Sequence, residues 1–233
     1  MKNKKKIILQ FLPFAFTLAF CILAVSLHHI ACPTVIPSVY IQAPAYALVP
    51  LIFPALEKWA HIKVPGFLIA VITIQIIISV DLGTALNCYA FIPHYDKFLH
   101  TYFGVWGAQI IYYFIYVLGG GRMKEWGKLL FTMLGVLGIA AVWEVSEYAM
   151  SLIFGTDPQL WKAVLNNPSY HPLADTMWDI IVAAIGVVIF YVTLFIDVKS
   201  GGRLYRGTLT PRPLSKRVDE AEGIAEAQDG AGR

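Results

Sequence analysis

The sequence has few charged residues for its length. Asp, Glu, Lys and Arg together make up 14% of its 233 residues, whereas a soluble domain carries about a quarter. Hydrophobic residues account for 58%, and the mean hydropathy is +0.63. This composition excludes an ordinary soluble domain and predicts a polytopic membrane protein.

Several motifs that would identify an enzyme class are absent as well. The sequence contains no nucleophile elbow, no phosphate-binding loop and no zinc-protease motif, and no internal repeat is evident. Cysteine is scarce. Cys21 falls inside the first apolar run, and Cys32 and Cys88 fall in predicted outer loops, where they either form a disulfide or stay two unlinked small residues.

Apolar runs long enough to cross a bilayer predict an all-α protein, a polytopic transmembrane bundle of about six helices. Residues 1–198 are expected to form this membrane domain, and residues 199–233 a cytoplasmic, largely disordered tail. The second run contains three prolines and is expected to be kinked or broken. The predicted runs are Ile7 to Leu27, Val39 to Leu56, Val64 to Val80, Phe98 to Leu118, Leu129 to Phe154 and Met177 to Val198.

The placement of Lys and Arg predicts the orientation of these helices. With six spans and a cytoplasmic N-terminus, all but two of the 18 Lys and Arg residues fall on the cytoplasmic side. The exceptions are Lys97 and Lys162. We therefore expect a multi-pass protein of the plasma or inner membrane with both termini in the cytoplasm and its first helix retained as an anchor. The basic pI of about 8.7 reflects this bias and indicates no nucleic-acid partner.

Two carboxylates lie inside the fifth apolar run. An ionisable group at membrane depth costs a few kcal/mol, so it is retained where it faces the bundle interior or a site. Glu144 and Glu147 are three residues apart and share one helix face. That face continues through Leu137, Ala140 and Ser151, a spacing typical of a helix-packing seam.

Two further polar faces begin the fourth and sixth runs. Asp96 and His100 are four residues apart, and Asp175 and Asp179 repeat this spacing. Small residues continue both faces, and such residues let membrane helices approach closely, so both faces are predicted to point into the bundle. These small residues are Gly104 and Gly107 in the fourth run and Ala183 and Gly186 in the sixth.

The three faces all fall in the outer half of the membrane and are predicted to line one cleft open to the outside. The outer segments hold seven carboxylates and two lysines, so the cleft needs a cation or protons. Carboxylates with His suit a divalent metal, whose identity stays open. We expect Glu144, Glu147, Asp175 and Asp179 to hold the cation and Asp96 to orient His100 as a ligand or general base. The expected chemistry is metal-dependent hydrolysis or transfer on a lipid-linked or phosphorylated substrate.

Two other interpretations of the same residues stay open. A row of Asp, His and Glu side chains that extends from the outer surface into the membrane is also typical of a proton or cation pathway. The inner halves of the fourth and fifth runs, however, are apolar beyond Gln109 and Thr132. A structural polar network is the second alternative. In it, Asp96 binds His100, and Asp175 serves as a helix N-cap.

The three motifs, in this order and spacing, resemble the YjdF family of bacterial inner-membrane proteins of unestablished activity. They are more distantly similar to VanZ-type membrane proteins, which share the Asp-Lys-x-x-His helix start. The resemblance covers about residues 95–190, and the first three helices carry no matching motif. It implies a polytopic helical fold and the importance of the six site residues, without a substrate. The motifs are Asp96-Lys97-Phe98-Leu99-His100, Trp143-Glu144-Val145-Ser146-Glu147-Tyr148 and Asp175-Thr176-Met177-Trp178-Asp179.

Overall fold

The computed structural model is an all-helical bundle, and the predicted fold class is confirmed. It describes residues 2–32, 35–119, 122–160, 162, 165, 167, 171, 173–205 and 208–209, with side chains from residue 10 onward. Six of its helical segments are long and apolar enough to cross a membrane, as predicted. These candidate spans are Gln10–Ala31, Val39–Trp59, Gly66–Ala85, Tyr95–Leu118, Glu125–Phe154 and Ala174–Lys199.

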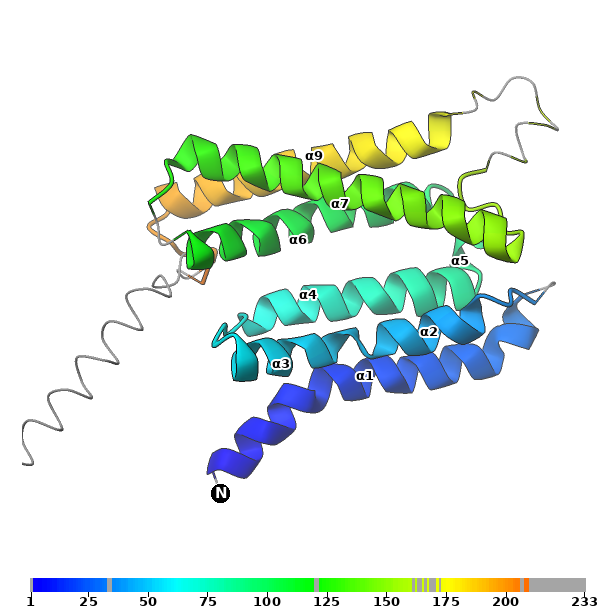
Figure 1. Ribbon diagram of the computed structural model, residues 1–233, viewed down its shortest axis with the longest axis horizontal. Coiled ribbons are helices and arrows are strands. Elements are labelled where there is room, and N and C mark those ends of the chain that lie inside the picture. The colour runs from blue at the N-terminus through cyan, green and yellow to red at the C-terminus, as the bar shows by residue number, and fades with distance from the viewer. Residues whose placement is uncertain are drawn as a thin grey trace, which may run out of the picture.

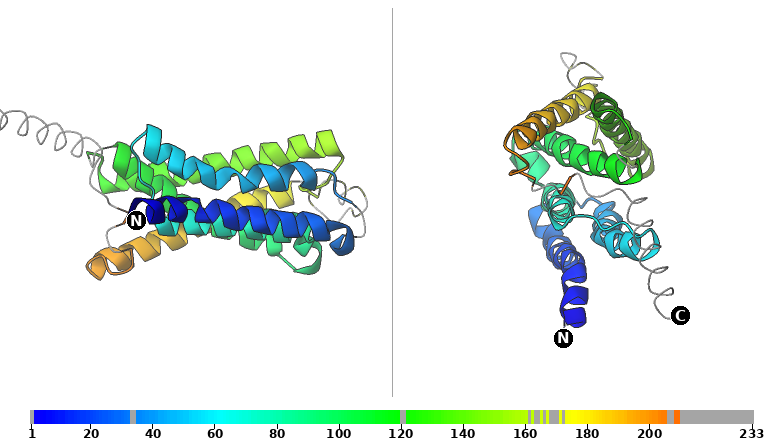
Figure 2. Two further views of the ribbon diagram at one scale, coloured as in Figure 1. Left: turned by 90° about the horizontal axis from the view of Figure 1, so that it is seen from below. Right: turned by 90° about the vertical axis from the view of Figure 1, so that its left-hand side faces the viewer.

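The helices form two groups that lie side by side (Figures 1 and 2). The first comprises α1 (Lys2–Ala31), α2 (Val39–Ala47), η1 (Val49–Leu51), α3 (Ile52–Trp59), α4 (Gly66–Ile76) and η2 (Ile77–Ala85). The short α5 (Cys88–Phe91) leads into the second group, which comprises α6 (Tyr95–Leu118), α7 (Glu125–Phe154) and α9 (Ala174–Lys199). Seen along the helices, the second group is a triangle of three, and α4 is its main neighbour in the first group.

The second span is broken, as its prolines predict. A 3-10 turn separates α2 from α3 at Val49–Leu51 and includes Pro50, which cannot donate a backbone hydrogen bond. The third span changes from α-helix to the wider π-helix over Ile77–Ala85. Asp81 lies in this π-helical stretch and is 2% exposed.

Helices α6 and α9 cross in backbone contact. A Cβ atom added to Gly104 would lie 2.1 Å from the Ala183 carbonyl oxygen, and one added to Gly186 would lie 2.3 Å from that of Thr101. Only glycine fits at such a crossing. The predicted inward faces of both helices are confirmed here, and the seam on α7 is confirmed from Ala140 to Ser151.

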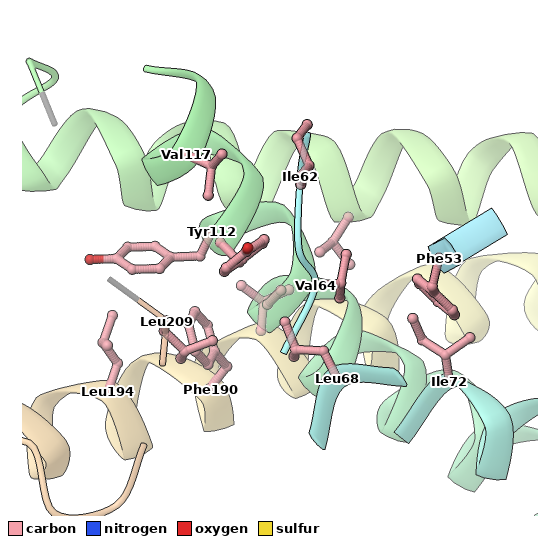
Figure 3. Packing of buried hydrophobic residues seen from close by; sticks show 14 of the residues in the cluster. Phe53, Ile62, Val64, Leu68, Ile72, Tyr112, Val117, Phe190, Leu194 and Leu209 are labelled. Atoms are coloured by element: carbon pink, nitrogen blue, oxygen red, sulfur yellow. The ribbon is translucent and has the colours of Figure 1, made fainter. Parts of the chain in front are cut away.

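The largest apolar core fills the end of the bundle where α1 begins and α9 ends (Figure 3). Phe53, Leu68, Tyr112 and Phe190 pack together there and join the two groups. After α9 the chain returns to this core, and Leu209 is 1% exposed. Residues 210–233, where disorder is predicted, lie outside the described residues.

The starts of α6 and α9 and the end of α7 lie together at the opposite end of the bundle (Figure 1). The start of α1 and the end of α9 share one end, as six spans require. Which end faces the cytoplasm stays a prediction from the Lys and Arg distribution. The three cysteines are all free, so Cys32 and Cys88 are unlinked.

Candidate functional site

The charged site is built where the first turns of α6 and α9 meet. Asp96, Lys97 and His100 come from α6, and Asp175 and Asp179 come from α9. The close glycine crossing lies one to two turns further along both helices, so the two sets of side chains are held near each other. The predicted convergence of these two polar faces is therefore observed.

Lys97 lies at the centre of the acidic groups. Its Nζ atom is 2.5 Å from Asp175 Oδ1, 2.8 Å from Asp179 Oδ1 and 3.0 Å from Asp96 Oδ2. The distribution of Lys and Arg predicts Lys97 on the outer side of the membrane, and no sequence motif predicts a role for it. This role was predictable from the position of Lys97 beside Asp96 in an outer half rich in acidic residues, because an excess of buried carboxylates needs a nearby cation.

Asp96, His100 and Asp179 form a group that could hold a metal ion. His100 Nε2 is 3.5 Å from Asp96 Oδ1 and 3.8 Å from Asp179 Oδ1, and one ligand atom from each residue lies within 4.8 Å of the others. Two atoms that share an ion at about 2.1 Å are at most about 4.2 Å apart. Small shifts of the three side chains would therefore complete the site. We call these three residues the triad.

One atom of the triad lacks a partner. Asp179 is 1% exposed, and its Oδ2 atom makes no hydrogen bond to any described residue. A buried carboxylate oxygen without a partner costs about 1 to 3 kcal/mol or more. An oxygen of this kind next to His100 is a natural ligand position for a cation.

Helix α7 contributes Glu147 to the same region. Glu147 is 8% exposed, and its Oε1 atom accepts a hydrogen bond of 2.8 Å from Trp143 Nε1. Its charge is close enough to interact with those of Asp96 and His100. The third predicted face thus joins the other two, and Trp143 orients its carboxylate.

Glu144 lies one turn from Glu147 and has a different environment. It is 5% exposed, and the Gln159 side chain donates a hydrogen bond of 3.1 Å to Glu144 Oε2 and one of 3.0 Å to its carbonyl oxygen. The Oε1 atom has no hydrogen-bond partner among the described residues. Gln159 belongs to the loop after α7, so Glu144 ties that loop to the helix.

A cavity of about 420 Å³ reaches the triad at Asp96, and we call it the polar chamber. Carboxylates from α6, α7, the following loop and α9 face it together with Lys97. Tyr89 is 41% exposed, and desolvation of its phenol, followed by the charges of Asp96 and Glu147, raises the pKa of that phenol above its usual value. Residues lining the chamber include Asn87, Tyr89, His94, Tyr95, Asp96, Lys97, Trp143, Glu147, Asp157 and Asp175.

A second cavity of about 240 Å³ lies deeper, between the two helix groups, and we call it the apolar pocket. Tyr89 and Trp143 line both cavities, and His100 lines the apolar pocket. Asp96 lines the polar chamber. The triad therefore lies at the boundary between a charged cavity and an apolar one, a feature that no sequence motif indicated.

Two expectations about individual residues need comment. Asp175 is not the N-cap of α9, because Leu173 holds that position and Asp175 lies in the first turn, bound to Lys97. Asp96 does contact His100, as the structural alternative expected. His171 is exposed at the helix start and accepts a hydrogen bond from the Leu173 backbone.

Comparison with known proteins shows which family the chain belongs to. The profile of the family described as "Predicted membrane protein (DUF2238)" matches residues 10–200. The chain belongs to this family, which is the YjdF family that the three motifs resemble, so that prediction is confirmed. The match also includes the first three helices, where sequence analysis found no motif. Neither the curated proteins nor the solved structures include a significant match to the chain.

Proposed function

Starting from membership of this membrane-protein family, we propose that the chain binds a divalent cation at the triad and acts on a phosphorylated or lipid-linked substrate in the polar chamber. The reaction class is metal-dependent hydrolysis or transfer. In the proposed orientation, residues 1–198 form the membrane domain, the chamber opens on the non-cytoplasmic side, and the tail from residue 199 is cytoplasmic.

The observation that supports this proposal is the partnerless Asp179 Oδ2 atom within the triad. Hydrogen bonding alone would favour a fully paired carboxylate at a position only 1% exposed. A divalent cation would bind this oxygen, and the imidazole of His100 would complete the ligand set with the carboxylates of Asp96 and Asp179. Asp81 Oδ2, Gln109 Oε1 and Glu144 Oε1 also have no hydrogen-bond partner among the described residues, but only Asp179 Oδ2 belongs to the triad.

Each charged residue then has a proposed role. Asp96, His100 and Asp179 hold the cation, which when bound polarises a phosphate oxygen or a water molecule. Glu147, oriented by Trp143, faces the chamber and serves as a further ligand or as a proton acceptor for water. Asp175 holds Lys97 from the other side. Glu144, which sequence analysis assigned to the cation, supports Glu147 and the Gln159 loop in this scheme.

Lys97 binds two of the carboxylates that would hold the cation. Its ammonium group already pairs with Asp96 and Asp179, so a metal at the triad must displace it. The side chain is 24% exposed and lines the chamber, so it can turn toward the cavity while keeping Asp175. There it would bind the phosphate of the substrate as a point charge.

Proton- or cation-coupled transport is the competing function. It requires a polar path from the chamber to the other end of the bundle. Beyond the triad, the described residues form the apolar core around Phe53, Leu68 and Phe190. Buried polar side chains also lie toward the other end of the bundle, but Gln109 bonds to Tyr205 and Lys128 to Glu125 rather than to the triad, which favours a one-sided site.

The test is metal binding by the purified full-length protein in detergent. We expect about one Mn²⁺ per chain, measured from the loss of the free-ion EPR signal, and loss of this binding in Asp179→Asn and Asp96→Asn. Asp157→Asn is the matched control, because Asp157 lines the same chamber but is outside the triad. Its binding should equal that of the unmodified protein.

Two results would contradict the proposal. Absence of Mn²⁺ and Zn²⁺ binding in folded protein would refute the cation site and favour proton transfer or a structural network. Loss of binding in Glu144→Gln and none in Asp96→Asn would instead favour the cation site predicted from the sequence, formed by Glu144, Glu147, Asp175 and Asp179 on α7 and α9. Folding of each variant is checked by size-exclusion profile and thermal unfolding.

A further inference from the structure

We infer that the apolar pocket holds the hydrocarbon chain of the substrate, so that the ligand is a single-chain amphiphile whose phosphorylated headgroup occupies the polar chamber. The headgroup part of this inference rests on the proposed function. The chain part rests on the cavity itself, which the proposed chemistry does not otherwise use.

The two cavities adjoin at Tyr89 and Trp143. Tyr89 and Trp143 line both of them, so one ligand can extend past these rings from one cavity into the other. His100 faces the apolar side while Asp96 faces the polar side. A ligand that spans the boundary would place its headgroup linkage beside the triad.

The walls of the pocket suit a hydrocarbon chain. They are made largely of aliphatic and aromatic side chains, among them Leu99, Phe103 and Ile76. Several polar groups on the α4 side of the wall already have partners within the protein. The Gln75 Oε1 atom accepts a hydrogen bond of 3.1 Å from Trp106 Nε1, and Ser79 Oγ donates one of 2.7 Å to the Gln75 carbonyl oxygen. An apolar occupant therefore leaves these two hydrogen bonds intact.

The size and the mouth of the pocket favour one chain that enters from the bilayer. Its volume of about 240 Å³ lies below the roughly 300 Å³ at which pockets for drug-sized ligands begin. It therefore fits a segment of one chain better than two chains or a ring system. Ile139 lines the pocket yet remains 48% exposed on the membrane-facing side of α7. A chain can thus pass from the lipid beside Ile139 into the pocket.

The charge of the chamber determines which headgroup fits this chain. A phosphate alone is repelled by the carboxylates, but a triad-bound cation and Lys97 together offer it two positive centres. We therefore expect binding of an alkyl phosphate to require the divalent cation. An alkyl alcohol of the same length, which has no such contacts, should bind more weakly.

The experiment uses dodecyl phosphate with a diazirine in its chain, added to the full-length protein in phosphatidylcholine nanodiscs with Mn²⁺. After irradiation, mass spectrometry locates the labelled peptides. We expect labelling at the pocket walls on α4, α6 and α7, at least tenfold competition by unlabelled dodecyl phosphate, and little competition by dodecanol or inorganic phosphate.

Variants of neighbouring residues on α7 test whether the pocket is the site. Ala140 is 1% exposed and lines the pocket, so Ala140→Phe fills it. Val142 is 65% exposed and absent from the pocket wall, so Val142→Phe is the matched control. We expect at least tenfold less labelling in Ala140→Phe and no change in Val142→Phe, with Mn²⁺ binding kept in both. Ile139→Trp narrows the mouth and replaces Ala140→Phe if that variant fails to fold.

The outcomes separate this inference from the proposed function. Unchanged labelling in the folded Ala140→Phe or Ile139→Trp variant, or labels spread over lipid-facing residues, would overturn the chain site while leaving the metal result intact. Labelling of the pocket without any Mn²⁺ binding would refute the proposed function and the phosphate contact, and would support the chain site. Labelling that needs Mn²⁺ and is lost in Asp179→Asn would support both.

Discussion

Replacing Lys97 by Met is the perturbation that separates a metal site from a structural ion network. Lys97 pairs with Asp96, Asp175 and Asp179. In a network that only stabilises the fold, removal of the ammonium leaves three carboxylates without their shared cation. In a metal site, the same removal deletes the group that competes with the incoming cation. Met keeps most of the length of the side chain and its apolar stem.

The size of the effect follows from Coulomb's law. A cation at the triad would lie within about 4 Å of the present Lys97 ammonium position, so the lysine must turn away before the cation binds. We take an effective dielectric constant of about 40, between about 20 near a protein surface and about 80 in water, because Lys97 turned away would lie in the open chamber. At a separation of about 8 Å, a divalent ion and a single positive charge then still repel by about 2 kcal/mol. Since 1.4 kcal/mol is a factor of ten, Lys97→Met should bind Mn²⁺ roughly 30-fold more tightly.

The assay is Mn²⁺ titration by EPR at low ionic strength, together with thermal unfolding with and without Mn²⁺. We expect the metal-free variant to be less stable than the unmodified protein, because buried carboxylates lose their counter-ion, and we expect Mn²⁺ to restore its stability. Binding of dodecyl phosphate should weaken in the same variant. Equal or weaker Mn²⁺ binding in folded Lys97→Met would refute the idea that Lys97 and the cation compete for one place.

Further predictions concern packing and the remaining acids. Gly186→Val should lower the Tm in detergent by many degrees, because the new Cβ would meet the Thr101 carbonyl oxygen at 2.3 Å, whereas Gly138→Ala, with no atom within 4 Å of its new Cβ, should change it little. Trp143→Phe should destabilise the protein by about 1 to 3 kcal/mol in denaturant unfolding, since the buried Glu147 carboxylate loses its donor. Asp81→Asn should leave Mn²⁺ binding unchanged, because Asp81 lies in η2 outside both cavities; a loss of binding there would place the site in the other helix group.

The sequence carried enough information for the helices and for the inward faces of α6, α7 and α9. Long apolar runs have few structural alternatives in a bilayer, because each backbone group must bond within its own helix. The faces were predictable because polar and small residues recur at helical spacing, and the crossing of Gly104 with Gly186 confirms this for α6 and α9.

The partners within the site were less predictable, because they depend on distances between helices. Spacing along one helix suggested Asp175 and Glu144 as cation ligands, but in the structure Lys97 binds Asp175 and Gln159 binds Glu144. The apolar pocket had no signal in the sequence, since its wall residues come from both helix groups and resemble ordinary core residues. The π-helical stretch around Asp81 also went unpredicted, because its composition does not differ from that of an α-helix.

The position of each carboxylate along its helix determines whether the helix dipole stabilises its negative charge. Asp96 and Asp175 lie in the first turns of α6 and α9, where the helix dipole favours a negative charge by about 0.3 to 1 kcal/mol. Asp179 lies a turn deeper and Glu147 lies two turns before the end of α7, so both are beyond the terminal turns in which the dipole acts. Neither charge gains from the dipole of its own helix, although Glu147 accepts a hydrogen bond from Trp143 and Asp179 pairs with Lys97, and their exposures are only 8% and 1%. The cost of keeping these two acids must be offset by what binds between the helices, so Asp179 and Glu147 are the positions at which loss of charge should affect function more than folding.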